Sequence, residues 1–470
     1  MKIRLLIGIV IVSLLIGCAV GPKYSRPIVQ PPSAFRGSGD AAAAPAPDSL
    51  ADLKWFEVFK DEALQELIRT ALVDNYDLHR AVARISAARA NLGITRSEQL
   101  PNFTAGADMT TLRNSGSGQV ALPGGFSRDR TFGTVALNLL SFEVDIWGRL
   151  RRATEAARAD LLASEENRKA VMTTVVGDVS AAYFNLLELD MELEIARETL
   201  GTRQESLRLI QARQQGGVAT LLDVRQAEQL VYGAAQTIPD IERLIEQTEN
   251  QINLMLGKDP GPVARGRSLT EQEQPPSAPP GLPSSLLERR PDIRAAEQNL
   301  AAATANIGVA KAAYFPSISL TGFLGGQSNQ LSNLFGGAGG AWNFAPQTTL
   351  PIFNAGRVKS SVRLTEAQRQ LALTQYQQAI KTGFREVSDA LVEYRKVKEI
   401  RAQQVLLVTT LQDRSRLAYL RYRGGVDTLL NALDADRDLF NAELSLALTR
   451  RNELLGLVQL YKALGGGWRQ

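Results

Sequence analysis

Few residues of this 470-residue chain could carry out covalent or acid–base chemistry. It has one histidine, His79, and one cysteine, Cys18. A metal site needs several imidazole, thiolate or carboxylate ligands, and an activated nucleophile needs a base beside it. Because His79 lies in a polar, helical-looking stretch without a second His or Cys to join it, we expect a solvated surface residue. The sequence therefore predicts that the protein is not an enzyme and holds neither a metal nor a cofactor.

Cys18 is the one residue for which a reaction is expected. Lys2 and Arg4 form a basic start, and an apolar run follows from Leu5 to Ile16. Such a run is too short to cross a bilayer as a helix and has the length of the apolar part of a secretory signal. The alternative is a transmembrane anchor in which Cys18 is a buried free thiol.

The residues around Cys18 indicate the class of export signal. The segment Leu15-Ile16-Gly17-Cys18 resembles a bacterial lipoprotein box. This resemblance implies a signal peptide at 1–17 and a covalent lipid on Cys18, the first residue of the mature chain. In the same resemblance, Ala19 implies sorting to the outer membrane. Once Cys18 is modified, the exported protein has no thiol left for a disulfide.

The charge of the chain is balanced. Lys and Arg number 53 and Asp and Glu 49, which leaves a net charge of +4. This balance argues against a nucleic-acid groove or a track for an acidic substrate. We therefore expect no nucleic-acid partner.

The chain contains an internal duplication. The offset between its copies is 215 (292 − 77) in the first part and 208 (356 − 148) in the second. A unit of this size is a duplicated domain-sized motif and not a solenoid repeat. The interval from Gly148 to Gly216 and from Gly356 to Gly424 is 68 residues in both copies, which indicates a constrained length. The matching segments are Asp77-Leu78 and Asp292-Ile293, Asn91-Leu92-Gly93 and Asn306-Ile307-Gly308, Pro101-Asn102-Phe103 and Pro316-Ser317-Ile318, and Gly216-Gly217-Val218 and Gly424-Gly425-Val426.

Each copy contains a predicted β-hairpin, at about 102–147 and about 317–352. Apolar and small polar residues alternate there over segments of about ten residues, as in transmembrane β-strands. The glycine-rich run Gly336 to Gly340 is predicted to be a hairpin loop and not a phosphate-binding loop, because no helix follows it. Four aromatic residues either form a girdle at the membrane interface or pack at the strand–helix junction: Phe142, Trp147, Trp342 and Phe344.

Long helices follow each hairpin. Apolar residues from Val171 to Leu200 recur every three or four positions, and no proline interrupts 148–216 or 356–424. A helix of about 65 residues would be roughly 100 Å long, so we expect a coiled coil or the wall of an α-barrel. Shorter helices are predicted at 60–98, 220–256, 284–313 and 428–464.

These patterns divide the chain into consecutive parts. They are the signal peptide 1–17, a lipidated tether 18–52, a first structural repeat 53–257, a Pro-rich linker 258–283, and a second structural repeat 284–470.

Four strands cannot close into a barrel within one chain. An open sheet edge in hydrocarbon leaves backbone groups unpaired, so spanning strands must form a closed barrel. Two chains would give eight strands, whose interior fills with side chains, whereas three would give twelve strands and a lumen. An open duct therefore favours a homotrimer.

Several segments carry a resemblance to a known family. They are Gly21-Pro22-Lys23-Tyr24 after Cys18, Trp55-Phe56, Asn75-Tyr76-Asp77-Leu78, Phe142 to Arg149, Arg289-Arg290-Pro291-Asp292-Ile293, and Pro351 to Arg357. In these segments the chain resembles the TolC family of bacterial outer-membrane efflux proteins, in its lipidated branch.

The resemblance implies a mixed α and β fold in the outer membrane. The fold has a transmembrane β-barrel, with four strands per chain and twelve in a trimer, continued by a long periplasmic α-helical barrel. It also implies the partners: outer-membrane lipid, a periplasmic adaptor protein and an inner-membrane efflux pump that delivers drugs or other small molecules. The alternative is a lipid-anchored periplasmic coiled-coil scaffold without a pore, which would need no alternating strands.

The resemblance places the functional residues at two helix-hairpin tips. Glycine allows the left-handed backbone with which a long helix ends and turns back. In the family these tips dock the adaptor and form the constricted entrance. The docking residues are Gly216, Gly217, Val218 and Ala219 in the first tip, and Gly424, Gly425 and Val426 in the second.

Four residues are candidates for the periplasmic gate: Asp223, Tyr422, Asp427 and Asp434. Asp427 stands where some members carry Arg, and Asn431 where they carry Asp, so three copies of Asp427 would form an acidic ring that favours cations. Each candidate also has a structural reading. Asp223 and Asp427 could cap the following helices, Asp434 could be a solvated acid, and Tyr422 could pack between helices.

Overall fold

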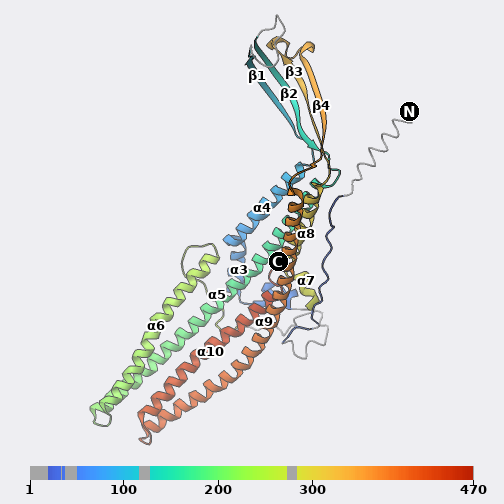
Figure 1. Ribbon diagram of the computed structural model, residues 1–470. Helices are drawn as coiled ribbons and strands as arrows, with labels where there is room; N and C mark the ends of the chain where they lie inside the picture. Colours follow the sequence, from blue (N-terminus) through green and yellow to red (C-terminus); the bar gives the residue numbers. More distant parts are fainter. Residues whose placement is uncertain (1–18, 33, 37–49, 116–127, 273–282, 469–470) are drawn as a thin grey trace. The chain divides into compact units, whose positions relative to one another are not determined.

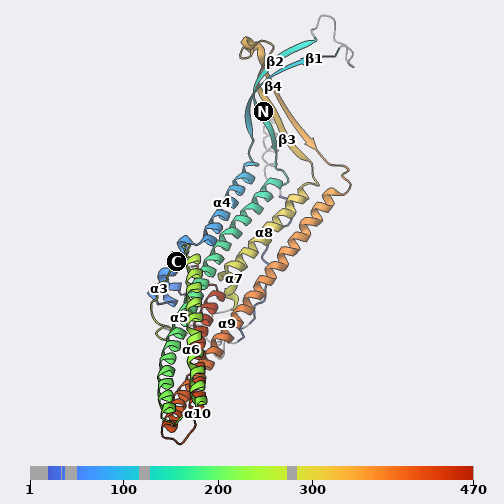
Figure 2. The same ribbon diagram turned by 90° about the vertical axis from the view of Figure 1, so that its left-hand side faces the viewer.

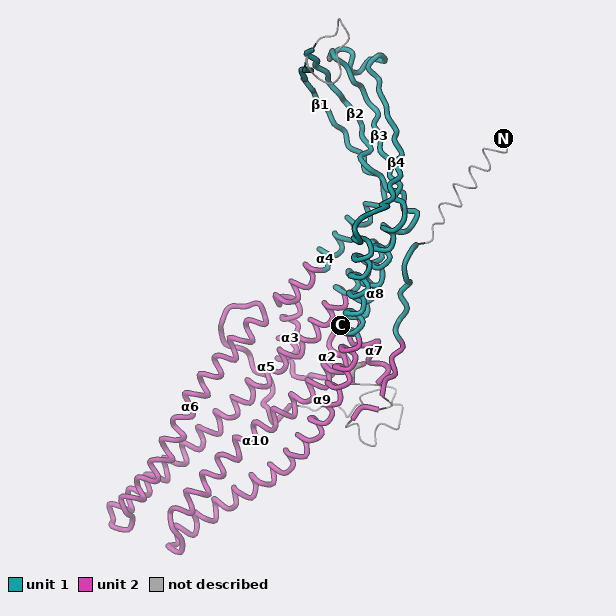
Figure 3. The backbone as a smooth tube through the Cα atoms, in the orientation of Figure 1, with its two compact units in different colours: residues 1–27, 85–164, 296–376 teal, residues 28–84, 165–295, 377–470 magenta. Residues whose placement is uncertain are grey.

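The computed structural model describes residues 19–32, 34–36, 50–115, 128–272 and 283–468. The predicted signal peptide and Cys18 lie outside the described residues. The chain divides into two compact units, each assembled from three separate stretches of sequence. Unit 1 comprises 1–27, 85–164 and 296–376, and unit 2 comprises 28–84, 165–295 and 377–470 (Figure 3). Both units thus take residues from both copies of the duplication.

The four predicted strands form one antiparallel sheet in unit 1, in the order β1-β2-β3-β4 (Figures 1 and 2). Phe103 pairs with Leu139 in the first hairpin, and Ile318 pairs with Thr348 in the second. β2 also pairs with β3, with a register shift between Leu139 and Phe142. Outer strands β1 and β4 each have one unpaired edge in the single chain. The strands are β1 (Phe103–Arg113), β2 (Asp129–Glu143), β3 (Ser317–Ser328) and β4 (Gly340–Thr349).

Long helices enter the sheet unit and continue in the other. The two longest, α5 (Arg149–Gln215) and α9 (Arg357–Arg423), have 67 residues each, in agreement with the constant interval between the glycines. The mixed α and β fold class is therefore confirmed. The remaining α-helices are α2 (Trp55–Val58), α3 (Glu62–Asp74), α4 (Tyr76–Ser97), α6 (Leu221–Met255), α7 (Leu286–Arg289), α8 (Pro291–Ala312) and α10 (Leu429–Ala463).

Short 3-10 turns link some of these elements. Their bounds are Leu50–Asp52, Pro283–Ser285, Leu331–Asn333 and Gly337–Gly339. The last two lie between β3 and β4, so the glycine-rich run belongs to a hairpin connection, as predicted.

Two of the predicted helices are broken. The expected helix 60–98 is interrupted at Asn75, whose side-chain oxygen accepts from the backbone N–H of Asp77 at 2.9 Å and of Leu78 at 3.3 Å. This N-cap starts α4 as a separate helix. The expected helix 284–313 is likewise divided before Pro291, because a proline disfavours the helical conformation of the residue that precedes it.

Residues 19–26 were expected to be part of a tether, and in unit 1 they make specific contacts. The Val20 N–H donates to the Trp147 carbonyl at 2.9 Å. The Arg152 guanidinium donates to the Val20 and Gly21 carbonyls, at 3.3 Å each. Gly308 leaves space for this segment, since a Cβ there would lie 2.6 Å from the Val20 oxygen.

The same position in the first repeat is open. A Cβ on Gly93, the counterpart of Gly308, would meet no atom within 4 Å. The two copies therefore differ in what covers this glycine. Only the second copy is covered by the segment that follows Cys18.

In unit 2, a buried carboxylate connects the short helices to α5. Asp61 is 2% exposed and caps α3 by accepting from the Ala63 and Leu64 N–H groups. It also accepts from the Tyr183 hydroxyl at 3.0 Å and from the Gln272 amide at 2.8 Å. Burial opposes ionisation, but these hydrogen bonds hold the pKa of Asp61 below its usual value.

The apolar part of α5 is a core helix segment. α5 is the one described helix with an apolar window long enough to span a bilayer, and 67% of that window is buried within the structure. Val176, Val179 and Tyr183 of α5 are at most 1% exposed. The sheet, not α5, is thus the element suited to contact lipid.

Trp147 packs at a strand–helix junction. Its ring stacks on Phe315 with centroids 4.6 Å apart, and its indole N–H donates to the Pro316 carbonyl at 2.8 Å. Trp342 and Phe344, on β4, are 75% and 58% exposed. The second pair is therefore exposed, as a membrane girdle requires, whereas Trp147 is used for packing.

Candidate gate at the helix tips

The first tip joins α5 to α6 through Gly216 to Ala219. Gly217 has φ +76°, and the Val218 N–H donates back to the Arg213 carbonyl at 2.8 Å. This left-handed glycine closes the C-terminus of α5 and lets the chain reverse. Val218 is 69% exposed beyond the turn, so an apolar side chain stands at the end of the hairpin.

The second tip repeats this geometry between α9 and α10. Gly425 has φ +70°, and the Val426 N–H donates to the Arg421 carbonyl at 3.1 Å. Val426 is 67% exposed, nearly the same as its counterpart Val218. The two tips are therefore equivalent in backbone and in their exposed valine.

Asp223 is used as a helix cap. Its N–H donates to the Thr220 Oγ1 at 3.1 Å, and its carboxylate accepts from the Thr220 N–H at 2.7 Å. This reciprocal pair is a capping box. The carboxylate also accepts from the Thr220 hydroxyl at 2.8 Å, so its hydrogen bonds are made within its own hairpin.

Asp427 is paired within the second tip. Its Oδ2 accepts from the Arg421 Nε at 3.0 Å, and its Oδ1 accepts from the Thr428 N–H at 2.8 Å and the Asn431 amide at 2.7 Å. The Arg421 hydrogen bond, followed by that from Asn431, lowers the pKa of Asp427. The Asn431 side chain is thus a direct hydrogen-bond partner of the Asp427 carboxylate. A ring of three such tips would carry Asp–Arg pairs in place of isolated acids.

Asp434 and Tyr422 have different surroundings. Asp434 makes an exposed ion pair with Arg437 at 3.1 Å, one turn further along α10. Tyr422 is 9% exposed and lies in an apolar cluster, with the Arg213 guanidinium 4.7 Å from its ring centroid. The cluster joins both hairpins and also contains Ile210, Val224, Ala227, Leu429, Ala432 and Leu433.

Of the four gate candidates, Tyr422 is therefore the one whose contacts connect one hairpin to the other. A second connection of this kind, which the sequence does not predict, is the buried ion pair of Arg203 and Asp436. Its partners are 233 residues apart, and neither stands in a motif, so spacing gave no signal for it.

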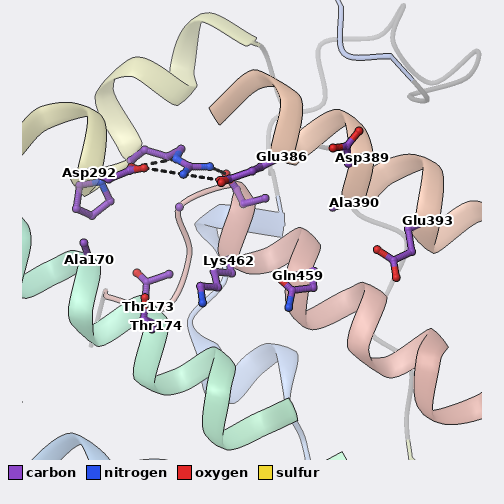
Figure 4. Close-up of a pocket in the computed structure, with 14 residues that line it drawn as sticks. Ala170, Thr173, Thr174, Asp292, Glu386, Asp389, Ala390, Glu393, Gln459 and Lys462 are labelled. Carbon is purple, nitrogen blue, oxygen red and sulfur yellow. Dashed lines mark hydrogen bonds and ion pairs between the residues drawn. The ribbon is translucent and has the colours of Figure 1, made fainter. Parts of the chain in front are cut away.

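A cavity of about 460 Å³ lies near the start of α8 in unit 2 (Figure 4). Arg290 pairs there with both Asp292 and Glu386, at 2.6 and 2.7 Å. These ion pairs satisfy the buried guanidinium and join α8 to α9. Among the described residues, no group of three or more His, Cys, Asp or Glu side chains is arranged to hold a metal ion.

Comparisons with known proteins agree over nearly the whole chain. Residues 67–258 and 282–466 match the family model for outer membrane efflux proteins. The chain is 39% identical to the probable efflux pump outer membrane protein TtgC of Pseudomonas putida, over 96% of this chain and 93% of that protein. It is 35% identical to the cation efflux system protein CusC of Escherichia coli, over 97% of each.

Solved structures share the fold. The structure of the open state of the Neisseria gonorrhoeae MtrE outer membrane channel matches with a TM-score of 0.85 at 32% identity, over 96% of this chain and 99% of that one. The outer-membrane channel OprN matches with a TM-score of 0.87 at 30% identity, over 96% and 100%.

Proposed function

The chain belongs to the outer membrane efflux protein family, and from this premise we propose that it is the passive exit duct of a three-part efflux system. In this role it takes drugs or other small molecules from an inner-membrane pump and a periplasmic adaptor protein and releases them outside. The protein is an outer-membrane channel component, as its relatives are. Conduction through a duct needs no catalytic group, so we also infer that the chain is not an enzyme.

The sheet is the observation that carries the proposal. Four strands with unpaired edges at β1 and β4 cannot be stable in hydrocarbon as a single chain. Closure by three copies gives twelve strands and a lumen. A coiled-coil scaffold without a pore would have no use for these strands, so the duct is the better account of the chain.

We propose that the exposed tips dock the adaptor. Val218 and Val426 present apolar side chains at equivalent positions of the two hairpins. Three chains would thus offer six similar knobs to a partner with repeated apolar grooves. The Asp427–Arg421 pair would hold the shape of the second tip and contribute to the entrance.

Two measurements test these roles. The purified protein should give ion currents in planar bilayers, and a protein that inserts as a trimer without conducting would refute the duct. Val218→Asp with Val426→Asp should keep the currents yet lose drug efflux in cells. Val73→Asp, at a residue of α3 that is 67% exposed, is the matched control. Full efflux by the tip variant would refute adaptor docking there.

We also propose that Cys18 carries the lipid that anchors the mature chain in the outer membrane. The contacts of Val20 and Gly21 in unit 1 support this, because they would hold the residue after the lipid close to the sheet unit. Labelled palmitate should be incorporated into the wild type and not into Cys18→Ala. Equal labelling of both would contradict the assignment.

A further inference from the structure

Residues on the four strands of unit 1 alternate between two faces of the sheet, and one of these faces is almost entirely apolar. Met109, Leu324 and Trp342 belong to it and are 70%, 65% and 75% exposed in the single chain. In a barrel closed in the membrane, this face is directed toward lipid, and the other face lines the lumen. The paired residues of the apolar face are Phe103 and Leu139, Ala105 and Leu137, Ala107 and Val135, Met109 and Gly133, Leu324 and Trp342, and Gly322 and Phe344.

Asp108 of β1 lies on the opposite face, which lines the lumen. It is opposite Thr134 of β2, and Thr134 is opposite Gln327 of β3. The Asp108 side chain is exposed and makes no hydrogen bond or ion pair with the residues that the structure describes. Arg130, a basic residue of the same face, is opposite Leu112, four residues and about 13 Å further along the strand. The acid is therefore not neutralised within its own hairpin.

The second copy of the duplication has an aromatic residue at the position equivalent to Asp108. The offset of 215 that relates β1 to β3 converts position 108 into 323, which is Phe323. Phe323 is opposite Asn138 of β2 and Asn343 of β4, so it lies on the same polar face as Asp108. Equivalent positions of the repeat recur at one level around the axis of a closed barrel. Three chains would thus place three carboxylates and three phenyl rings alternately around the lumen.

The spacing of these six side chains suits an organic cation. Twelve strands about 4.8 Å apart and tilted by about 40° form a wall roughly 75 Å around, so neighbouring positions of the ring are roughly 12 Å apart. A drug-sized cation at this wall contacts a carboxylate with one side and a phenyl ring with the other. The face of a phenyl ring attracts cations through its quadrupole. An anion of the same size would be repelled by the carboxylate and gain no such attraction from the ring.

We propose that Asp108 and Phe323 of three copies form an alternating ring in the β-barrel, and that this ring binds organic cations on their way out of the duct. This inference rests on the proposed duct function and adds the class of solute that the barrel selects. Asp108 is the middle residue of β1 (Phe103–Arg113), so the ring lies about halfway along the strands. It is thus a site of the sheet, separate from the candidates at the helix tips.

A thiol beside Asp108 reports the charge of the ring. The one native cysteine is Cys18, so Thr134→Cys adds a single reporter, and the wild type supplies the background. The reporter is treated with a cationic and an anionic methanethiosulfonate of similar size. Adding Asp108→Asn should lower the ratio of the cationic to the anionic reaction rate about fivefold at 0.1 M salt, because the carboxylate is about 6 Å from the thiol.

Two comparisons accompany this measurement. In 1 M salt the rate ratio of the Thr134→Cys protein itself should fall severalfold, because salt screens the carboxylate, and this needs no second substitution. Asp129→Asn is the matched control. It removes an acid of the same hairpin that pairs with Arg113 at 3.6 Å, and it should leave the ratio unchanged.

Two ions of the same shape test the ring as a binding site. Tetraphenylphosphonium should slow the reaction of Thr134→Cys with an uncharged thiol reagent, and tetraphenylborate, which carries the opposite charge, should not. Phe323→Leu keeps an apolar side chain and should raise the phosphonium concentration for half protection by about two- to fivefold. Phe344→Leu, on the apolar face, is the matched control and should leave that concentration unchanged.

The outcomes separate the ring from the duct. A trimer in which the Thr134→Cys thiol reacts, but with a rate ratio that Asp108→Asn does not change, would overturn the ring alone. Equal protection by the two tetraphenyl ions, or equal effects of Phe323→Leu and Phe344→Leu, would also overturn it. A trimer in which no reagent reaches the Thr134→Cys thiol would have no water-filled lumen, and this would instead refute the duct on which the inference rests.

Discussion

The duplication predicts the register in which two copies of the chain meet. Phe103 and Ile318 are equivalent positions of the two copies. Phe103 pairs with Leu139 and Ile318 pairs with Thr348, so Leu139 and Thr348 are equivalent as well. Leu139 pairs with Gly322 of β3. The counterpart of Gly322 in β1 is Ala107 (322 − 215). If β4 meets the next copy as β2 meets β3, Thr348 of one copy lies opposite Ala107 of the next.

The free energy at stake in this contact is large. β4 has ten residues, and half of its backbone groups face away from β3. In hydrocarbon, roughly ten unpaired groups at a few kcal/mol each would cost tens of kcal/mol. The single chain therefore depends on its neighbours to close the barrel, and a register other than the predicted one would have to supply as many hydrogen bonds.

Cysteine pairs test the register, because side chains on a strand alternate between faces. Because paired strands run antiparallel, a step of four residues back from Thr348 matches a step of four residues forward from Ala107. This places Phe344 of one copy opposite Thr111 of the next. Phe344→Cys with Thr111→Cys should cross-link the copies on oxidation, since opposed residues have Cα atoms about 4.5–5.5 Å apart. Phe344→Cys with Leu112→Cys is the control, because a shift of one residue turns the second thiol to the other face.

The assay is electrophoresis of heated samples without reductant. The first pair should give covalent dimers and trimers that reductant converts to monomers, and the control should give few. Equal cross-linking by the control would contradict the register. The absence of any cross-link in a verified trimer would contradict the equivalence of the two hairpins.

Three further predictions concern single sites. Asp61→Asn should destabilise the fold by about 2–3 kcal/mol at neutral pH. Because the pKa of Asp61 is lowered in the folded protein, the difference in melting temperature between wild type and variant should shrink as pH falls below about 4. Burial, followed by the Glu188 carboxylate, raises the pKa of Glu192 to about 8, so the stability of the wild type should decline as pH rises from about 4.3 to 8. Glu192→Gln should remove that decline, and melting temperatures of variant and wild type that fall in parallel with pH would contradict this prediction. Gly308→Ala should expose the N-terminal segment to proteolysis and lower the melting temperature, whereas Gly93→Ala should be neutral or stabilising; equal effects of the two would refute the packing argument.

The elements with strong periodicity could be predicted from the sequence, because their pattern follows from their own geometry. The four strands and the two long helices were expected, and α5 and α9 end where the glycines at 216 and 424 indicated. The break at Asn75 was missed because a side-chain cap inside an apolar helical pattern outweighed that pattern. The packing of residues 19–26 was missed because extended chain has no periodicity to detect.

The parts of the site that could not be predicted are contacts between residues far apart in the sequence. The gate candidates could be placed at the tips, but their partners depend on the hairpin geometry: Asp427 pairs with Arg421 across the turn, and Tyr422 with Arg213 of the other hairpin. No spacing rule relates Arg203 to Asp436, because two antiparallel hairpins bring together residues whose separation along the chain is set by everything between them. Such pairs become visible only with the fold.

The difference between the two tips has a more specific meaning in the structure than in the sequence. Ala219 in the first copy and Asp427 in the second suggested a gate made of exposed acids, but Asp427 is balanced by Arg421 and Asn431 at its own turn. A charge compensated at this distance projects a weak field into a lumen. The contacts that join one hairpin to the other near the tips are of a different kind, and they include the buried pair of Arg203 and Asp436. We therefore expect the second tip to present a compensated Asp427–Arg421 pair, and not an isolated acid, to its surroundings.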